Sequence, residues 1–229
     1  MLNLVIAETA LETIPVETFR HTSLKKIRNS GKKPTEILLD RTLHHFAILS
    51  SNLKQDYKRA RPDISHIILL NALATPLFKI NQLKVFVHTI NNQVIKIKDN
   101  VRIPKSYARY EGLILDLIKN KKIVSKDGIV LLELSDNLSF SDLLQTCIKP
   151  DIIVGLSING IFKNFEDISK ELFQFKNPCI VVGGFPKGHF SEHIESHLEK
   201  KYSISNLSLE AHIVVSRLIY EFEKINNVN

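Results

Sequence analysis

The pattern of apolar and polar positions changes character halfway along the chain. From residue 128 onward, short β-branched runs alternate with longer segments of helical period. The predicted elements are strands at 128–134, 151–157, 178–183 and 202–205 and helices at 139–147, 165–174, 190–200 and 208–224. This alternation is typical of βα units on a mostly parallel sheet. In such α/β sheets, ligands bind beyond the carboxyl ends of the strands.

The beginning of the chain is more basic and less regular. Residues 2–7 alternate enough to predict a strand. The basic run 21–34 predicts a short helix that ends at Gly31, because glycine favours the position after a helix.

The region from 63 to 125 predicts a hairpin and a helix that extend the α/β unit. Residues 63–75 have helical spacing, with Asp63 as the expected N-cap. Residues 84–98 predict a hairpin, because Asn91-Asn92 can take positive φ at a tight turn. Pro104 can begin the apolar helix that follows, since proline is tolerated in a first helical turn.

Composition places the chain among ordinary globular proteins of one large domain. It has 229 residues, of which 44% are hydrophobic and 24% charged. Cys147 and Cys179 form no C-x-x-C pair, which fits a reducing compartment, so we expect a cytoplasmic protein. Glu8 and Glu12 interrupt the apolar N-terminus, and no segment is apolar enough to predict a membrane span. The formal net charge of +7 permits a nucleic-acid partner.

Residues 180–190, IVVGGFPKGHF, read as a strand that ends in a glycine-rich loop. Gly183 and Gly188 have P-loop spacing, but the Lys and Ser/Thr that should follow are missing, and the dinucleotide pattern does not fit either. Two further loops, 155–160 and 203–209, follow predicted strands in the same half of the chain. Three such loops together favour a ligand site over simple turn chemistry.

Basic residues near tyrosines suggest a contact with RNA. Three cations occur in 58–61, and Arg102, Lys105 and Arg109 recur close to two tyrosines. Cations bind phosphates and aromatic rings stack on unpaired bases. The alternative is a solvated helix face with ordinary ion pairs.

Other catalytic patterns are weak. His193 and His197 have the i, i+4 spacing of zinc ligands, but Glu195 is misplaced for a metalloprotease base and no third ligand is evident. Ser157 lacks the G-x-S-x-G context of an acyl-transfer nucleophile. Neither a metal site nor acyl transfer is therefore expected.

Eight ordered motifs, spread from residue 3 to about 222, resemble one family. They are LVIAETALETIP, GKKPTEILLDRTLHH, RARPDISH, VFVHT, RIPKSYARYEGL, IVGLSINGIF, VVGGFPKGHFSE and SISNLSLEA. The chain resembles the archaeal branch of the ribosome-biogenesis pseudouridine N1-methyltransferases of the SPOUT superfamily. The resemblance implies a single α/β domain over 1–229, with a mostly parallel sheet flanked by helices. A trefoil knot is implied within 150–225, with much of the RNA-binding surface on 63–125.

The resemblance also implies an activity and partners. The family transfers a methyl group from S-adenosylmethionine to N1 of a pseudouridine in small-subunit ribosomal RNA, as a homodimer. It also acts in small-subunit assembly, so ribosomal proteins or assembly factors are possible partners. A non-catalytic RNA-binding assembly factor is one alternative, and a SPOUT enzyme acting on tRNA or a ribose 2′-OH is another.

The site residues implied by the resemblance fall into two groups. The cofactor residues would be Leu156, Gly183, Gly188, Ile204, Ser205, Asn206, Leu207, Ser208 and Leu209, and the RNA residues Arg61, Arg102, Lys105 and Arg109. Arg61 would stabilise the developing anion, with Asp63 orienting it; Asp63 itself would be a poor base because of that pairing. Lys105 replaces a family arginine, and Leu207-Ser208-Leu209 lacks the family's proline.

Overall fold

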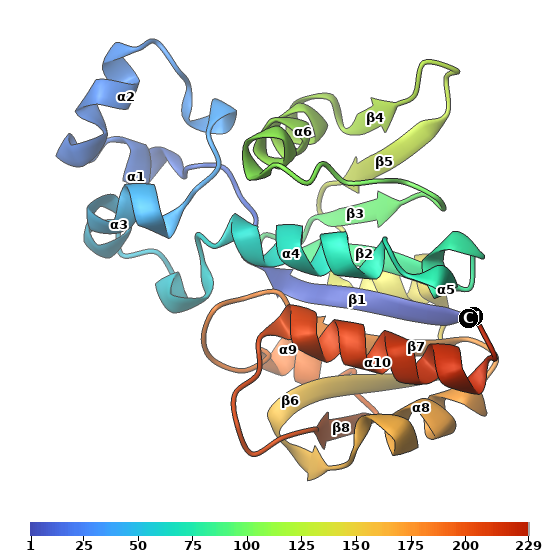
Figure 1. Cartoon of the computed structure of the whole chain (residues 1–229). Helices are drawn as coiled ribbons and strands as arrows, with labels where there is room; N and C mark the ends of the chain where they lie inside the picture. Colours follow the sequence, from blue (N-terminus) through green and yellow to red (C-terminus); the bar gives the residue numbers. More distant parts are fainter. Residues whose placement is uncertain (229) are drawn as a thin grey trace.

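The computed structural model describes residues 1–228, which form one eight-stranded sheet with helices on both faces (Figure 1). The strands are β1 (Leu2–Thr9), β2 (Leu83–Thr89), β3 (Val94–Ile97), β4 (Lys122–Val124), β5 (Val130–Ser135), β6 (Ile152–Phe162), β7 (Pro178–Gly183) and β8 (Lys200–Ser203). Their order is β4-β5-β3-β2-β1-β7-β6-β8. The five strands from β2 to β8 in this order are parallel, and the three on the other side are antiparallel. The sheet is therefore mostly parallel, as predicted.

Four long helices and one short one pack on one face of the sheet, and short helical segments pack on the other. The helices are α1 (Val16–Phe19), α2 (Lys25–Asn29), α3 (Arg41–Ser50), α4 (Pro62–Ala72), α5 (Pro76–Lys79), α6 (Tyr107–Asn120), α7 (Phe140–Asp142), α8 (Phe165–Phe173), α9 (Glu192–Glu195) and α10 (Ala211–Ile225). Single turns are η1 (Thr22–Leu24), η2 (Pro34–Glu36), η3 (Asp56–Lys58) and the π-helical η4 (Leu143–Ile148). Helix α10 packs between α4 and α8 (Figure 1).

Strand β1 is buried along its whole length and divides the core in two. Leu4 and Ile6 belong to the cluster that includes residues of α4 and α10. Val5 and Ala7 point to the opposite face, into the cluster that includes residues of α7, η4 and α9. Successive side chains of a strand alternate between faces, and a strand buried on both faces reads as a continuous apolar run. Strand β1 is therefore an inner strand of the sheet, between β2 and β7, and is covered on both faces.

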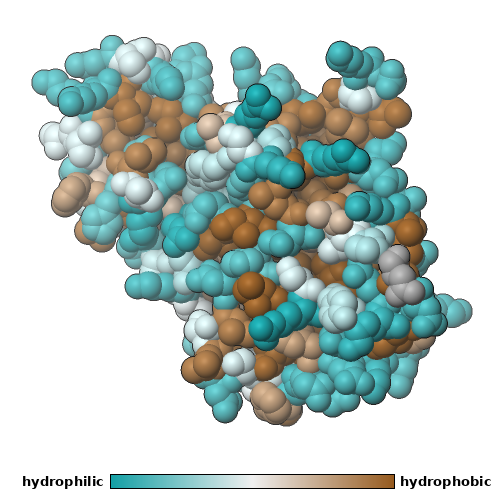
Figure 2. Space-filling model, in the orientation of Figure 1, coloured by the Kyte–Doolittle hydropathy of each residue, from teal (hydrophilic) through white to brown (hydrophobic). Residues whose placement is uncertain are grey.

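Residues 10–60, called the N-terminal lobe below, leave the sheet after β1 and carry α1, α2 and α3. The lobe has its own small core, which includes Leu24, Leu39 and Ile48. It stands apart at the upper left of Figure 1, and Figure 2 shows apolar side chains gathered on it. The exposed apolar side chains of the lobe include Leu43 and Phe46 of α3.

Most predicted elements are confirmed. The strands at 2–7 and 178–183, the helix at 165–174 and the hairpin over 84–98 are all present. The turn of the hairpin has Asn92 with φ 54, as expected for this residue type. The helix ending at Gly31 is also present, and Gly31 has φ 80.

The predicted loop at 155–160 is wrong, because β6 continues to Phe162. Leu156 and Ile161 both pair with Tyr202 of β8, so residues 157–160 form a bulge in the strand. A Cβ on Gly160 would lie 2.5 Å from the Tyr202 carbonyl carbon. Gly160 thus serves a close approach of two backbones and not a turn.

Three helix predictions need correction. Within 190–200 only α9 is helical, because the chain must return to the sheet at Lys200. Within 139–147 the helix is short and continues as the π-turn η4. Asp63 is not the N-cap of α4: Arg61 occupies that position, and Asp63 lies in the first turn.

Pro104 does not begin the following helix. Helix α6 begins at Tyr107, after Ser106 as N-cap. No helix within residues 1–228 is both long and apolar enough to cross a membrane.

Candidate functional site

A cavity of about 270 Å³ lies at the carboxyl ends of β7 and β8, beside the bulge in β6. Its walls come from the start of this bulge, the loop after β7, the segment between β8 and α10, and the start of α4. Parallel strands present the same end to one edge of the sheet, so their loops meet there. The cavity is therefore placed where the βα pattern predicted a ligand site.

The loop 184–191, which follows β7, forms one wall of the cavity. Gly184 holds it to β1, since its N–H donates to the Ala7 carbonyl at 2.8 Å and its carbonyl accepts from Ala10 at 2.9 Å. Gly188 has φ 97, a conformation that side chains rarely adopt. A Cβ on Gly188 would also lie 2.8 Å from the ring of Tyr57. The loop therefore requires glycine at this position.

The opposite wall is the segment 203–209. Its bends are held locally, because the Ser203 hydroxyl donates to the Ser205 carbonyl and the Ser205 hydroxyl accepts from the Leu207 N–H, both at 3.0 Å. Within residues 1–228, the N–H groups of Ser208 and Leu209 donate to no other group. These backbone donors are free to meet a ligand.

Eight of the nine predicted cofactor residues line this cavity. They are Leu156, Gly183, Gly188, Ile204, Ser205, Leu207, Ser208 and Leu209. Asn206 is exposed and is not part of the lining. Lys187 and His189 do line it, and both are exposed.

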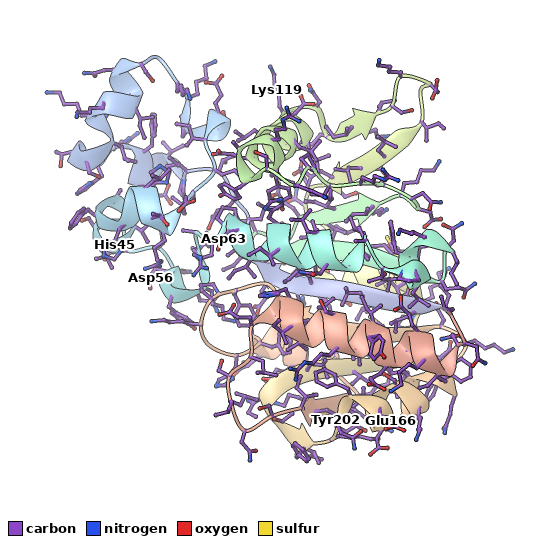
Figure 3. The ribbon with its side chains drawn as sticks, in the orientation of Figure 1. His45, Asp56, Asp63, Lys119, Glu166 and Tyr202 are labelled. Carbon is purple, nitrogen blue, oxygen red and sulfur yellow. The ribbon has the colours of Figure 1, made fainter. Side chains whose placement is uncertain are left out.

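Arg61 forms a two-point ion pair with Asp63 at the lobe-side end of α4, where Figure 3 labels Asp63. Nε donates to one carboxylate oxygen at 2.8 Å and Nη2 to the other at 2.7 Å. These hydrogen bonds, outweighing partial burial, raise the pKa of Arg61 above its ordinary value. The guanidinium is thus a permanent cation with a fixed plane.

Arg61 lines two adjoining spaces. It belongs to the cavity above and also to a more open hollow with Asp40, Asp63 and Tyr107. The Tyr107 hydroxyl donates to Asp40 at 3.3 Å. Burial, together with the neighbouring Asp40 carboxylate, raises the pKa of Tyr107 well above its ordinary value of 10.0, so the hydroxyl stays protonated.

The other three predicted RNA residues lie outside both spaces. Arg102, Lys105 and Arg109 are exposed, and none forms an ion pair with another of residues 1–228. Their segment is attached to α4, because His66 Nε2 lies 2.8 Å from the Pro104 carbonyl oxygen. They place three exposed cations in and just before the start of α6.

The cation cluster 58–61 is not an RNA surface as a whole. Lys58 is only 2% exposed, and its Nζ lies 2.8 Å from a carboxylate oxygen of Glu8. Arg59 is paired with Glu12. Only Arg61 of the three cations faces a cavity. Sequence spacing could not show this, because the partners of Lys58 and Arg59 are about 50 residues away in the chain.

Histidines form no metal site in the part of the chain that the structure describes. Nδ1 of His197 forms a hydrogen bond with the carbonyl oxygen of His193, at 2.8 Å. No group of three or more His, Cys, Asp or Glu side chains among residues 1–228 could hold a metal ion.

The model of the EMG1/NEP1 methyltransferase family matches residues 4–223 of the chain. The chain belongs to this family. A curated relative in Thermococcus sibiricus, named ribosomal RNA small subunit methyltransferase Nep1, is 39% identical over 97% of this chain and 98% of its own length. The protein of the same name in Saccharolobus solfataricus is 36% identical, covering 95% of this chain and 94% of the relative.

A solved structure of a family member has the same fold. The crystal structure of Archaeoglobus fulgidus Nep1 bound to S-adenosylhomocysteine matches with a TM-score of 0.84 at 29% identity, and covers 98% of each chain. Family membership and fold thus agree with the resemblance found in the sequence.

Proposed function

We propose that the protein methylates N1 of a pseudouridine in small-subunit ribosomal RNA, with S-adenosylmethionine as the donor. One observation carries this proposal: Arg61 lines both the cavity at the strand ends and the open hollow beside it. A donor held in the cavity and a base entering from the hollow would meet at this guanidinium. The relatives named for small-subunit ribosomal RNA methylation and the neighbour bound to S-adenosylhomocysteine support the assignment.

The cavity suits the donor in shape and chemistry. Apolar side chains of Leu156, Val182 and Leu209 line it and suit an adenine ring, while the free N–H groups of Ser208 and Leu209 suit its ring nitrogens. The glycines bring the loop 184–191 close without the Lys-Ser/Thr clamp of a P-loop. That combination suits a nucleoside without phosphate.

Methyl transfer requires the protein to align the donor methyl with N1 and to stabilise the negative charge that develops on the base. When bound, S-adenosylmethionine supplies a sulfonium methyl, which moves to N1 as the carbon–sulfur bond and the N1–H bond break, leaving S-adenosylhomocysteine and a proton. Arg61, held by Asp63, would stabilise the negative charge that develops on the uracil carbonyls. The base must be flipped out of its stack to reach the cavity, and cations around the hollow would hold its phosphates.

We propose further that the protein is a homodimer whose C-terminal segment forms a trefoil knot. Large apolar side chains stand exposed beside the cavity, among them Ile161 (76%), Phe162 (66%) and Leu207 (74%). A second copy over this face would bury them and close the cavity. The knot is supported by membership of the family, whose resemblance implied it.

Two measurements test the function. Calorimetry with S-adenosylmethionine tests the cofactor, and mass spectrometry of small-subunit RNA fragments carrying uridine or pseudouridine tests the methylated atom. We expect binding, and methyl transfer only to the pseudouridine fragment. Binding of RNA without binding of the donor would favour a non-catalytic assembly factor. Methylation of tRNA or of a ribose would contradict the substrate assignment.

A further inference from the structure

Glu8 lies at the carboxyl end of β1, between the cofactor cavity and the segment that carries Arg61. The residue is 6% exposed. Its Oε2 accepts from Lys58 Nζ at 2.8 Å and from the N–H of Ser191 at 3.1 Å. One carboxylate oxygen therefore joins three segments that are distant in sequence: the end of β1, the turn before α4, and the loop 184–191.

Lys58 completes the junction from the other side. Its ammonium group lies 4.5 Å from the ring centroid of Phe185, which stands in the loop 184–191 and lines the cavity. A desolvated ammonium over an aromatic face is attracted to the ring. The loop is thus held twice, by the Ser191 N–H at Glu8 and by the Phe185 ring at Lys58.

The two residues after Lys58 are also held in place. Arg59 pairs with Glu12, which is 3% exposed and follows β1 by three residues. The Ala60 carbonyl accepts from the Arg41 N–H at 2.8 Å, and Ala60 has φ 65. The buried carboxylates of Glu8 and Glu12 therefore fix the two successive cations Lys58 and Arg59, which lie just before Arg61 in the chain.

Stability alone does not explain why ion pairs are buried here. A buried ion pair is often no more stabilising than apolar side chains of similar volume, because both charges lose water. Glu8 also has φ 49, which is uncommon outside glycine and concentrates at functional sites. The strain and the buried charges meet where the loop 184–191 contacts the segment that leads to Arg61.

We propose that Glu8 is a positioning residue for methyl transfer, which fixes the cofactor loop 184–191 in register with Arg61. The inference rests on the proposed function, because it assumes a donor against the loop and a base at Arg61. Glu8 reaches neither: it acts through Ser191 on one side and Lys58 on the other. A displacement of about 1 Å between the methyl donor and the target base would reduce the rate of methyl transfer about 100-fold without removing either binding site.

Two variants break the junction in different ways. The double variant Glu8→Gln with Lys58→Met removes both buried charges; glutamine keeps the length of glutamate, and methionine is one atom shorter than lysine. Ser191→Pro replaces the N–H that Glu8 accepts with a ring carbon, and the backbone tolerates it, since Ser191 has φ −69, which proline adopts. The matched control is Lys84→Met with Asp99→Asn. It removes an ion pair of 2.6 Å at the start of β2, away from Glu8.

The readouts are kcat at saturating substrates and the separate Kd values for S-adenosylmethionine and RNA. For both test variants we expect kcat to fall about tenfold or more while each Kd changes less than about threefold. The control should keep kcat within about twofold, even where its melting temperature falls. A merely structural role would lower the melting temperature of the test variants and leave kcat of the folded protein unchanged.

Two outcomes would overturn the inference. One is a kcat within about twofold of wild type in both folded test variants. The other is a loss of S-adenosylmethionine affinity with kcat unchanged at saturation, which would show that Glu8 shapes only the cofactor site. Failure of the wild-type protein to methylate any RNA would instead contradict the proposed function.

Discussion

Arg61 and Asp63 face each other across one residue, and their side chains form two parallel hydrogen bonds of 2.8 and 2.7 Å. Pro62 between them starts α4, and its fixed φ helps to hold both side chains on one side of the helix end. Both side chains remain partly exposed, at 40% and 36%. A pair this open contributes little to folding, so its value lies in the direction it gives the guanidinium.

Arg61→Ala should weaken RNA binding and methyl transfer and leave the affinity for S-adenosylmethionine unchanged. Asp63→Asn keeps the shape of the side chain but replaces one of the two accepting oxygens with an NH2 group. We therefore expect methyl transfer to fall about tenfold, with a smaller loss of RNA affinity. Unfolding free energies should change by less than about 1 kcal/mol. Calorimetry with the donor and gel shifts with a small-subunit hairpin separate the effects. A variant that loses the donor and keeps the RNA would show that the two sites are wrongly assigned.

Gly188→Ala should weaken donor binding, because the loop 184–191 cannot keep its path with a side chain there. The residue has φ 97, and the added Cβ would meet the Tyr57 ring at 2.8 Å. Strain of this kind costs about 1–3 kcal/mol. Gly112→Ala is the control, since Gly112 lies in α6 with open space around it. There alanine should raise stability slightly and leave donor affinity unchanged, as calorimetry and thermal unfolding would show.

Local pattern was enough to predict the sheet and the place of the cavity. The strand at 178–183 and the helix at 165–174 follow from apolar period and flanking turn residues, and the alternation of the two indicates parallel strands. Local pattern failed where tertiary contacts decide. Gly160 looked like a turn residue, but its partner is the Tyr202 backbone, about 40 residues away.

The candidate site divides in the same way. The glycines and the segment 203–209 could be placed from sequence, since they follow strands directly. Glu8 could not, because in the sequence it only interrupts an apolar run and its partner Lys58 resembles a surface cation. Burial and long-range pairing are properties of the fold, and a single sequence carries no local signal for them.

Glu171 should make the protein lose stability in acid. It is partly buried, which raises its pKa, but hydrogen bonds from Lys163, Lys200 and Tyr202 outweigh this and lower the pKa from 4.5 to about 2. A carboxylate with a lowered folded pKa contributes stability above its unfolded pKa and loses it as pH falls. The loss should therefore run from about pH 4.5 to 2.

Glu171→Gln should flatten this acid limb and reduce stability at pH 7 by about 1 kcal/mol, because solvent screens part of the interaction. Urea unfolding at several pH values measures both effects. Glu166→Gln is the control, since that carboxylate of the same helix is exposed and forms a single ion pair within residues 1–228, with Lys170. An acid limb equally steep in Glu171→Gln and wild type would show that this network does not set the acid sensitivity.

Arg102, Lys105 and Arg109 should act on RNA through charge, since they are exposed and have no acidic partner within residues 1–228. Each phosphate contact to single-stranded RNA contributes about 0.7 to the slope of log K against log salt. Neutralising Arg102 or Arg109 to Gln should therefore reduce the slope by about that amount. Lys105→Arg should keep it, because the charge remains. Lys170→Gln on α8 is the control, where Glu166 already pairs with the cation. An unchanged slope in Arg102→Gln and Arg109→Gln would place the RNA elsewhere on the molecule.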